Sequence, residues 1–180
     1  KSGEVDSDFV VLAQTSISNW KNALLTPAEL VSRAASQGEL TLAMLYERYQ
    51  RSLKAYNAVD FDDLLALPVQ LFDTQPDVLV RWQNRIRYLL VDEYQDTNAV
   101  QYKLVQQLVG IRSGLTVVGD DDQSIYAWRG AQPENLSQLK HDFTALKLIK
   151  LEQNYRSCGR ILKAANQLIA NNPHEFEKAL

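Results

Sequence analysis

An acidic pair follows a short apolar run near the middle of the chain. Tyr88-Leu89-Leu90-Val91 leads directly into Asp92 and Glu93. Such a run is typical of a strand that is buried on both faces of a parallel sheet. At the end of such a strand, one carboxylate can hold Mg²⁺ while its neighbour orients an attacking water, as in nucleotide hydrolysis. An isolated Asp-Glu pair is more often a solvated strand-to-loop junction, so the surrounding residues have to decide between these two interpretations.

Two later strings also hold residues that could bind nucleotide or nucleic acid. Residues 119–131 read GDDDQSIYAWRGA, and residues 151–157 read LEQNYRS. Tyr126, Trp128 and Arg129 offer aromatic platforms for unpaired bases and a cation for phosphate or stacking. The alternative is that both rings pack in the core, as aromatic side chains usually do.

Taken together, these strings resemble the conserved motifs of one helicase family. Residues 91–98, VDEYQDTN, resemble motif II, the Walker B motif, of the superfamily 1 DNA helicases of the UvrD, PcrA and Rep type. Residues 119–131 look like the family's motif III, residues 151–157 like its motif IV, and residues 60–65, DFDDLL, like the segment that re-enters the motor domain after a helical insertion. The three aspartates of motif III and the string IANNPH at 169–174 are most similar to the Rep branch.

The resemblance implies a role for each matching residue in ATP hydrolysis. Asp92 would be the Mg²⁺ ligand and Glu93 the general base. Gln123 would reach the γ-phosphate, and Tyr155 would stack on the adenine. Arg156 would place a guanidinium on the γ-phosphate and stabilise the charge of the transition state, as an arginine finger does.

The resemblance also implies contacts with single-stranded DNA. It strongly favours Trp128 as a base-stacking residue, and it favours Tyr126 less strongly. Arg129 would either contact DNA or link the DNA-binding loop to the nucleotide, and both roles remain open. The implied partners are single-stranded DNA, DNA forks, and proteins of replication or repair.

The sequence predicts helices from residue 8 to the segment that begins at Pro76. Apolar spacings of three and four predict a helix over residues 8–24. After a break at Gly38, Leu42, Leu45, Tyr49 and Leu53 define one face of another helix. Pro76 opens a further short helix that carries Trp82. Thr26 can cap a helix with Pro27 in its first position and Glu29 completing a capping box. Asp60 can cap a helix over 61–72 that bends or ends near Pro68.

Strands and helices alternate in the remainder of the chain. Strands are predicted at 88–91, 115–118 and 146–151, and helices at 100–108, 133–139 and 161–169. This order indicates an α/β fold with function at the carboxyl ends of parallel strands. With the resemblance, it implies a partial RecA-like P-loop NTPase motor domain. Residues 1–57 would form a helical insertion subdomain (1B-like, partial), and residues 58–180 the motor domain (1A, partial).

The phosphate-binding loop that this fold needs is absent from the sequence. None of the seven glycines stands in a Gly-x-x-x-x-Gly-Lys-Ser/Thr frame. In the family the P-loop precedes the helical insertion, and the later motifs would follow Leu180. The resemblance therefore implies a piece that holds the metal and water side of an ATP cleft and is inactive alone. A sheet without its central strand would also expose apolar edges, so self-association is expected.

Composition sets broader limits. Of 180 residues, 46% are hydrophobic and 23% are charged, as in soluble globular proteins. The net charge of −3 argues weakly against a broad basic DNA-coating face but not against a narrow groove for a single strand. The lone Cys158 suits a reducing cytoplasm, no apolar run approaches a bilayer span, and the acidic N-terminus is unlike a signal peptide. His141 and His174 lack metal-ligand spacing.

Three functions are compatible with these features. The first is an ATP-driven translocase and helicase that moves 3′ to 5′ on single-stranded DNA with Mg²⁺-ATP. The second, within the same superfamily, is a helicase–nuclease subunit of the RecB or AddA type, which a nuclease domain farther along would identify. The third is a non-catalytic remnant that binds DNA or a replication partner, although the intact set of Asp92, Glu93, Gln123 and Arg156 argues against such decay.

Overall fold

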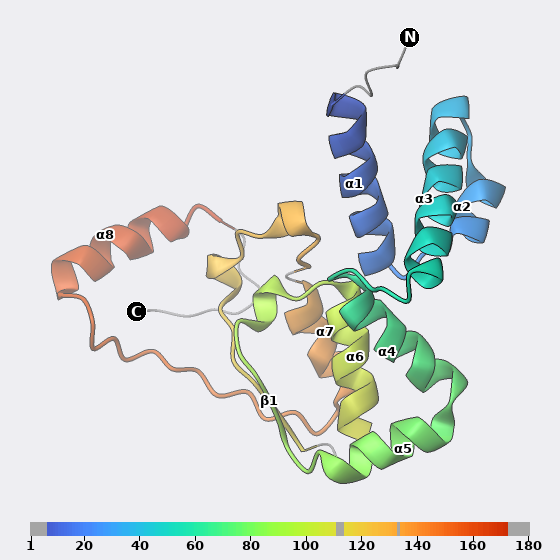
Figure 1. Cartoon of the computed structure of the whole chain (residues 1–180). Helices are drawn as coiled ribbons and strands as arrows, with labels where there is room; N and C mark the ends of the chain where they lie inside the picture. The colour runs from blue at the N-terminus through green and yellow to red at the C-terminus, as the bar shows by residue number, and fades with distance from the viewer. Residues whose placement is uncertain (1–6, 111–113, 133, 173–180) are drawn as a thin grey trace. The chain divides into compact units, whose positions relative to one another are not determined.

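The computed structural model describes residues 7–110, 114–132 and 134–172, with the side chain of Arg129 outside the description (Figure 1). The chain divides into two compact units. The first unit comprises the chain through Leu89 together with Asn98–Gly114, and the second comprises Leu90–Thr97 together with the chain from Leu115 onward. No helix in the described ranges combines the length and the apolar character that crossing a lipid bilayer requires.

The first unit is helical. Its helices are α1 (Ser7–Asn22), α2 (Pro27–Arg33), α3 (Gln37–Ala55), α4 (Asp63–Thr74), α5 (Pro76–Arg85) and α6 (Ala99–Val109). Helix α3 packs against α1 and α2, and α4 packs against α1, α5 and α6. A buried cluster of Ala66, Val69 and Val100 joins α4 to α6, with Leu65 and Leu104 packed against it. Apolar spacing, together with the capping signals at Thr26 and Asp60 and the proline at position 76, therefore predicted the helices of this unit.

Reciprocal hydrogen bonds between side chains and backbone lie at or just before the start of two of these helices. The Oγ1 of Thr26 accepts the Glu29 N–H at 3.3 Å, and the Thr26 N–H donates to Glu29 Oε2 at 2.8 Å, so the predicted capping box is confirmed. The same reciprocal pattern precedes α4. Asp60 Oδ1 accepts the Asp63 N–H at 2.9 Å, and Asp63 Oδ2 accepts the Asp60 N–H at 3.3 Å. The N-cap residue of α4 is Asp62, which makes no side-chain capping bond, so the prediction that Asp60 caps this helix is wrong. The reciprocal bonds of Asp60 and Asp63 instead close the turn that leads into α4.

Neither Gly38 nor Pro68 ends a helix. Gly38 does not separate helices but lies in the first turn of α3, because Ser36 Oγ accepts the Glu39 N–H at 3.2 Å and starts the helix before the glycine. At Pro68 the expected end of the helix is wrong, because α4 continues to Thr74, whereas the alternative of a bend stays a prediction. Val69 and Phe72 beyond the proline are buried, so packing of this helix against its neighbours outweighs the cost of the proline.

Gly110 and Gly38 are expected to respond to alanine in opposite directions. Gly110 has φ 55° and ψ −155°, and an added Cβ would lie 2.7 Å from the Gln83 side chain, which donates to the Gln107 carbonyl at 2.7 Å. Gly110→Ala should therefore destabilise the first unit by about 1–3 kcal/mol. A Cβ at Gly38 meets nothing nearer than 3.9 Å, so Gly38→Ala should stabilise by about 0.4–1 kcal/mol. Denaturant unfolding of both variants checks the signs, and a stable Gly110→Ala variant would contradict the strained conformation.

Lys21 is buried at the end of α1 and carries two carboxylate partners. Its Nζ lies 2.6 Å from Asp60 Oδ2 and 2.8 Å from Asp63 Oδ1, and 1% of its side chain is exposed. The Tyr49 hydroxyl also donates to Asp60 Oδ2, at 3.0 Å. Burial by itself would lower the pKa of Lys21, but the hydrogen bonds and charges of Asp60 and Asp63 outweigh burial and raise this pKa above its ordinary value. One buried cation thus joins α1 to the start of α4.

A chain of amides continues from this ion pair to α6. Asn22 Nδ2 donates to Asp62 Oδ1 at 2.8 Å, and Asn22 Oδ1 accepts from Asn98 Nδ2 at 2.8 Å. Asn98 also caps α6, because its Oδ1 accepts the Gln101 N–H at 3.0 Å. The start of α6, directly after the VDEYQDT string, is therefore held by the end of α1.

Two short strands form the sheet. Strands β1 (Leu89–Val91) and β2 (Leu115–Val117) pair in parallel, and the pairing extends beyond them through the Val118 N–H to the Val91 carbonyl at 2.8 Å. The predicted burial of β1 on both faces is wrong, because Leu90 is 72% exposed. The described chain is thus mostly helical with a small parallel sheet, which supports the α/β prediction only in part.

The third predicted strand, at residues 146–151, is wrong. These residues form no strand, and Leu148, Ile149 and Leu151 are 52%, 65% and 82% exposed. An apolar run supplies the propensity for a strand, but a strand also needs a neighbour for its backbone hydrogen bonds. The described residues offer this segment no such neighbour.

The described part of the second unit contains three short helical turns and two helices. It contains the 3₁₀ turns η1 (Tyr94–Asp96), η3 (Asp121–Gln123) and η4 (Ala127–Arg129), and the helices α7 (Glu134–Asp142) and α8 (Gly159–Ile169). Helix α7 packs against η1. Tyr94 is fully buried beside it, and burial, assisted by the charge of Asp142, raises the pKa of its hydroxyl well above the ordinary value. The motif II turn is therefore anchored in a small core of its own.

Candidate active site

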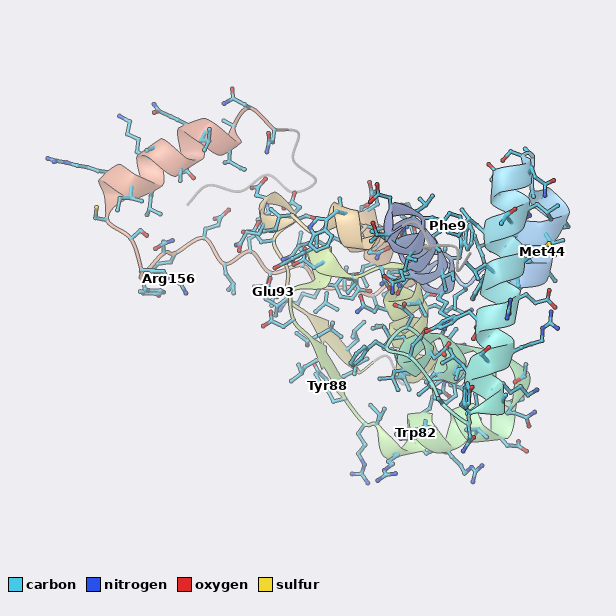
Figure 2. The ribbon with its side chains drawn as sticks, turned by 45° about the horizontal axis from the view of Figure 1, so that its top comes forward. Phe9, Met44, Trp82, Tyr88, Glu93 and Arg156 are labelled. Atoms are coloured by element: carbon cyan, nitrogen blue, oxygen red, sulfur yellow. The ribbon has the colours of Figure 1, made fainter. Side chains whose placement is uncertain are left out.

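Asp92 and Glu93 lie where β1 ends, and both side chains are exposed. Glu93 is labelled in Figure 2. Asp92 Oδ1 accepts the Glu93 N–H at 2.9 Å. Glu93 has φ 51° and ψ 44°, in the left-handed region, which costs a residue with a side chain about 1–2 kcal/mol. This conformation turns the chain sharply from the strand into η1. Strained backbone of this kind is concentrated at functional sites.

Gln95 holds the Glu93 side chain. Its Nε2 donates to Glu93 Oε2 at 2.7 Å, and its Oε1 accepts the Asp120 N–H at 3.0 Å. Only 1% of Gln95 is exposed. The Gln95 amide, which is buried, therefore connects Glu93, just after β1, to Asp120, just after β2.

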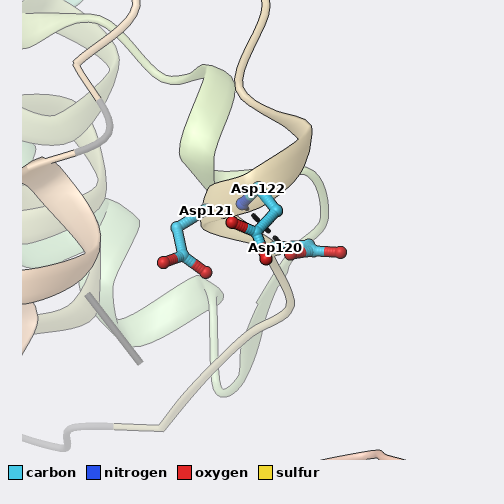
Figure 3. Close-up of side chains that lie close together, drawn as sticks. All are labelled: Asp120, Asp121 and Asp122. Carbon is cyan, nitrogen blue, oxygen red and sulfur yellow. Dashed lines mark hydrogen bonds between the residues drawn. The ribbon is translucent and has the colours of Figure 1, made fainter. Parts of the chain in front are cut away.

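Gln123 stands at the end of η3 with an exposed side chain. Its Nε2 donates to Asp120 Oδ2 at 2.7 Å. Asp120 Oδ1 also accepts the Asp122 N–H at 3.2 Å, so Asp120 acts as the cap of η3 (Figure 3). Asp120, Asp121 and Asp122 each place a carboxylate oxygen within 4.8 Å of the others. Since both oxygens of Asp120 already accept hydrogen bonds within the turn, the geometry accounts for this cluster as a turn cap.

Tyr126 and Trp128 form an exposed aromatic pair next to this turn. Their ring centroids are 6.4 Å apart with 48° between the planes. Trp128 is 71% exposed and Tyr126 is 38% exposed, so neither ring packs in the core. The backbone of Arg129 continues η4, whereas its side chain lies outside the described part, so neither role expected for this residue is tested.

Tyr155 and Arg156 lie on a separate, extended segment. Both are exposed, Tyr155 at 86%. Asn154 Oδ1 accepts the N–H groups of Arg156 and Ser157, each at 2.9 Å, and fixes the local turn. Figure 2 shows Glu93 and Arg156 on different segments of the second unit. The structure therefore brings Asp92, Glu93 and Gln123 into one hydrogen-bonded region, while Tyr155 and Arg156 are not joined to it by any hydrogen bond among the described side chains.

Two residues of this site had no role in the sequence analysis. Gln95 stands inside the motif II string, but its partner Asp120 is distant in sequence, so spacing could not reveal the contact. Gly119 precedes Asp120, and a Cβ there would lie 2.9 Å from Gln95 Oε1 and 3.3 Å from Leu136 Cδ2. The only signal in the sequence was the glycine itself, which often marks a close approach of the backbone to another group.

Comparisons with known proteins agree with the motif resemblance. The model of the UvrD/REP helicase N-terminal domain matches residues 4–144, more than three quarters of the chain. The chain is 60% identical to "ATP-dependent DNA helicase Rep" of Escherichia coli K12, over 99% of this chain and 27% of that protein. It is 47% identical to "ATP-dependent DNA helicase PcrA" of Staphylococcus aureus, over 91% of this chain and 22% of that protein.

The chain thus spans about a quarter of the length of the curated relatives it matches. Its similarity to the Rep proteins is higher than its similarity to the PcrA proteins, in agreement with the branch that the three aspartates and the IANNPH string indicated. The family match and the identity over nearly the whole chain establish that this chain belongs to the UvrD/REP helicase family.

Proposed function

We propose that the chain is part of an ATP-dependent DNA helicase that moves 3′ to 5′ on single-stranded DNA and unwinds duplexes at forks. The observation that carries this proposal is the exposed pair Asp92 and Glu93 at the end of β1, connected through Gln95 to the turn that holds Gln123. Relatives that share most of this sequence are named ATP-dependent DNA helicases. Bacterial DNA lies in the cytoplasm, which is therefore the proposed location.

The residues of this chain divide the work of hydrolysis as follows. Asp92 is an exposed hard-oxygen ligand at a strand end, which suits Mg²⁺, and the ion supplies positive charge to the phosphates when it is bound. Glu93 accepts the proton of the attacking water, and Gln123 contacts the γ-phosphate. Tyr155 stacks on the adenine, and Arg156 stabilises the charge that develops on the transferred phosphoryl group.

The phosphate cradle is proposed to come from another part of the whole protein. The sequence of this chain contains no P-loop frame, and the chain spans about a quarter of its relatives. We assign residues 1–57, which contain α1, α2 and α3, to a helical insertion subdomain, and residues 58–180 to a RecA-like motor domain. The small parallel sheet with Asp92 at a strand end supports the second assignment.

Trp128→Ala in the full-length protein is expected to weaken binding of single-stranded DNA by about 1–3 kcal/mol, because an exposed indole provides a stacking face for a base. Fluorescence anisotropy with a labelled oligothymidylate measures the loss. Trp82→Ala is the matched control, because Trp82 is also exposed, at 43%, but lies on α5 beside Arg85 (Figure 2). Equal affinities of the wild type and the Trp128 variant would exclude the stacking role.

The activity itself is tested with the full-length protein. Single-stranded DNA should stimulate Mg²⁺-ATP hydrolysis, and a duplex with a 3′ single-stranded tail should be unwound faster than one with a 5′ tail. Hydrolysis without stimulation by DNA, or no hydrolysis at all, would contradict the proposed function.

A further inference from the structure

Gln95 is the one described side chain that hydrogen-bonds to both Glu93 and Asp120. The orientation of its amide is determined, because the Asp120 backbone N–H can only donate and must face the oxygen Oε1. The nitrogen Nε2 then faces Glu93 Oε2, at 2.7 Å. A hydrogen bond to an ionised carboxylate is among the stronger ones in proteins, and here the donor is 1% exposed.

The surroundings leave this amide little freedom. Tyr94, the preceding residue, is fully buried, and its N–H donates to the Val118 carbonyl at 3.0 Å. Thr97, at the other end of η1, accepts from Asn135 Nδ2 at 2.9 Å through its carbonyl. Gly119 lies next to the amide and leaves room for Gln95 Oε1, because a Cβ at this position would lie only 2.9 Å from that oxygen. The backbone of η1 is thus fixed at both ends, and the side chain of Gln95 is confined between Glu93 and the start of the η3 turn.

We propose that Gln95 is a positioning residue, which holds the Glu93 carboxylate for catalysis and couples it to the turn that carries Gln123. This inference rests on the proposed function. When Gln123 moves on contact with a γ-phosphate, Asp120 moves with it, because Gln123 Nε2 donates to Asp120 Oδ2 at 2.7 Å. The Asp120 N–H then shifts the Gln95 amide, and the amide shifts Glu93. The position of the Glu93 carboxylate therefore depends on the bound nucleotide through the side chain of Gln95.

The alternative is that Gln95 only stabilises the fold, as buried amides usually do. Gln107 provides a matched comparison. It is also buried, and its Nε2 donates to a carboxylate, Asp73 Oδ1, at 2.8 Å and to the Val69 carbonyl at 3.2 Å, within the first unit. Replacement of either glutamine by methionine keeps the shape of the side chain and removes both its donor and its acceptor, so only a difference between the two sites is informative.

The test compares Gln95→Met and Gln107→Met in the full-length protein. Gln95→Met is expected to lower kcat for DNA-stimulated ATP hydrolysis by about 10- to 100-fold, the loss for a hydrogen bond to a charged group, and to leave KM for ATP within about twofold. Gln107→Met is expected to lower the midpoint of thermal unfolding without a change in kcat. A Gln95 variant with wild-type kcat, with a changed KM alone, or with a loss that Gln107→Met reproduces, would overturn the proposal.

Two further variants make the test complete. In a Glu93→Ala background, Gln95→Met should cause no additional loss of kcat, because Gln95 acts through Glu93; an additive loss would overturn the proposal.

If Gln95→Met does not fold, Gly119→Ala replaces it, since the new Cβ displaces Oε1 without removing the amide. A lower kcat at unchanged KM in Gly119→Ala supports the coupling, and wild-type kinetics overturn it. A wild-type protein without ATP hydrolysis would overturn the proposed function as well, whereas an active wild type with an unaffected Gln95 variant overturns only this inference.

Discussion

Glu93→Gln in the full-length protein is expected to lower kcat for DNA-stimulated ATP hydrolysis by about 10²–10⁴-fold, the usual contribution of a general base. Glutamine has nearly the size of glutamate but cannot accept a proton from water at neutral pH. Affinity for ATP should change little, because Asp92 and the residues that contact the nucleotide remain. Single-turnover hydrolysis and equilibrium binding of a fluorescent ATP analogue separate the two effects.

Glu47→Gln is the matched control for Glu93→Gln. Glu47 also exposes its carboxylate, and it pairs with Arg51 at 3.1 Å on α3, outside the candidate site. Its kcat should equal that of the wild type. The isolated chain should not hydrolyse ATP at all, because its sequence contains no P-loop frame to hold the triphosphate. Hydrolysis by the Glu93→Gln protein within a few-fold of the wild type would remove Glu93 from the role of base.

Lys21→Met should destabilise the first unit by about 3–5 kcal/mol, the cost of leaving a buried charge without its partner. The substitution keeps an unbranched apolar side chain but removes the cation between Asp60 and Asp63, at 2.6 and 2.8 Å. Native-state hydrogen exchange of amides in α1 and α4 of the full-length protein measures the loss. Arg51→Ala, which breaks an exposed pair on α3, should cost no more than about 0.5 kcal/mol.

The same ion pair makes a pH dependence with a definite sign. Burial by itself would raise the pKa of Asp60, but the hydrogen bonds from Lys21, the Asp63 N–H and Tyr49 lower it below 3.8. The contribution of Asp60 to the free energy of unfolding is therefore present above the pKa of the unfolded state and is lost as the pH falls through the pKa of the folded state. The pKa of Lys21 is raised above 10.5, so its contribution is present below that value and is lost as the pH rises through the folded pKa. Lys21→Met should flatten the alkaline loss, and an unchanged alkaline profile would contradict the pairing.

Local sequence signals predicted the helices well because their determinants lie within one turn. The capping box that begins at Thr26 connects residues three positions apart, and Pro76 occupies the first turn of α5 as expected. The failures have non-local causes. Burial of Leu90 and a strand at 146–151 both require neighbours that the local sequence does not specify, and the described residues do not supply them.

The candidate site shows the same division. Motif spacing placed Asp92 and Glu93 at the end of β1, and the exposure of Trp128 removed the alternative of a core indole. The catalytic and DNA-binding roles of these residues remain predictions. The Gln95 contact was not predictable, because its two partners come from turns that meet only after β1 and β2 have paired.

The left-handed backbone of Glu93 has a consequence for how this position evolves. Glycine adopts φ 51° without steric cost, and asparagine tolerates it better than glutamate does. Folding alone would therefore favour glycine or asparagine at position 93, whereas the proposed role as general base requires a carboxylate there. A lineage released from hydrolysis would gain stability by replacing this residue. Under the proposed role, position 93 keeps this strained backbone for the sake of its carboxylate, and Glu93→Gly is expected to raise the stability of the fold while it removes the base.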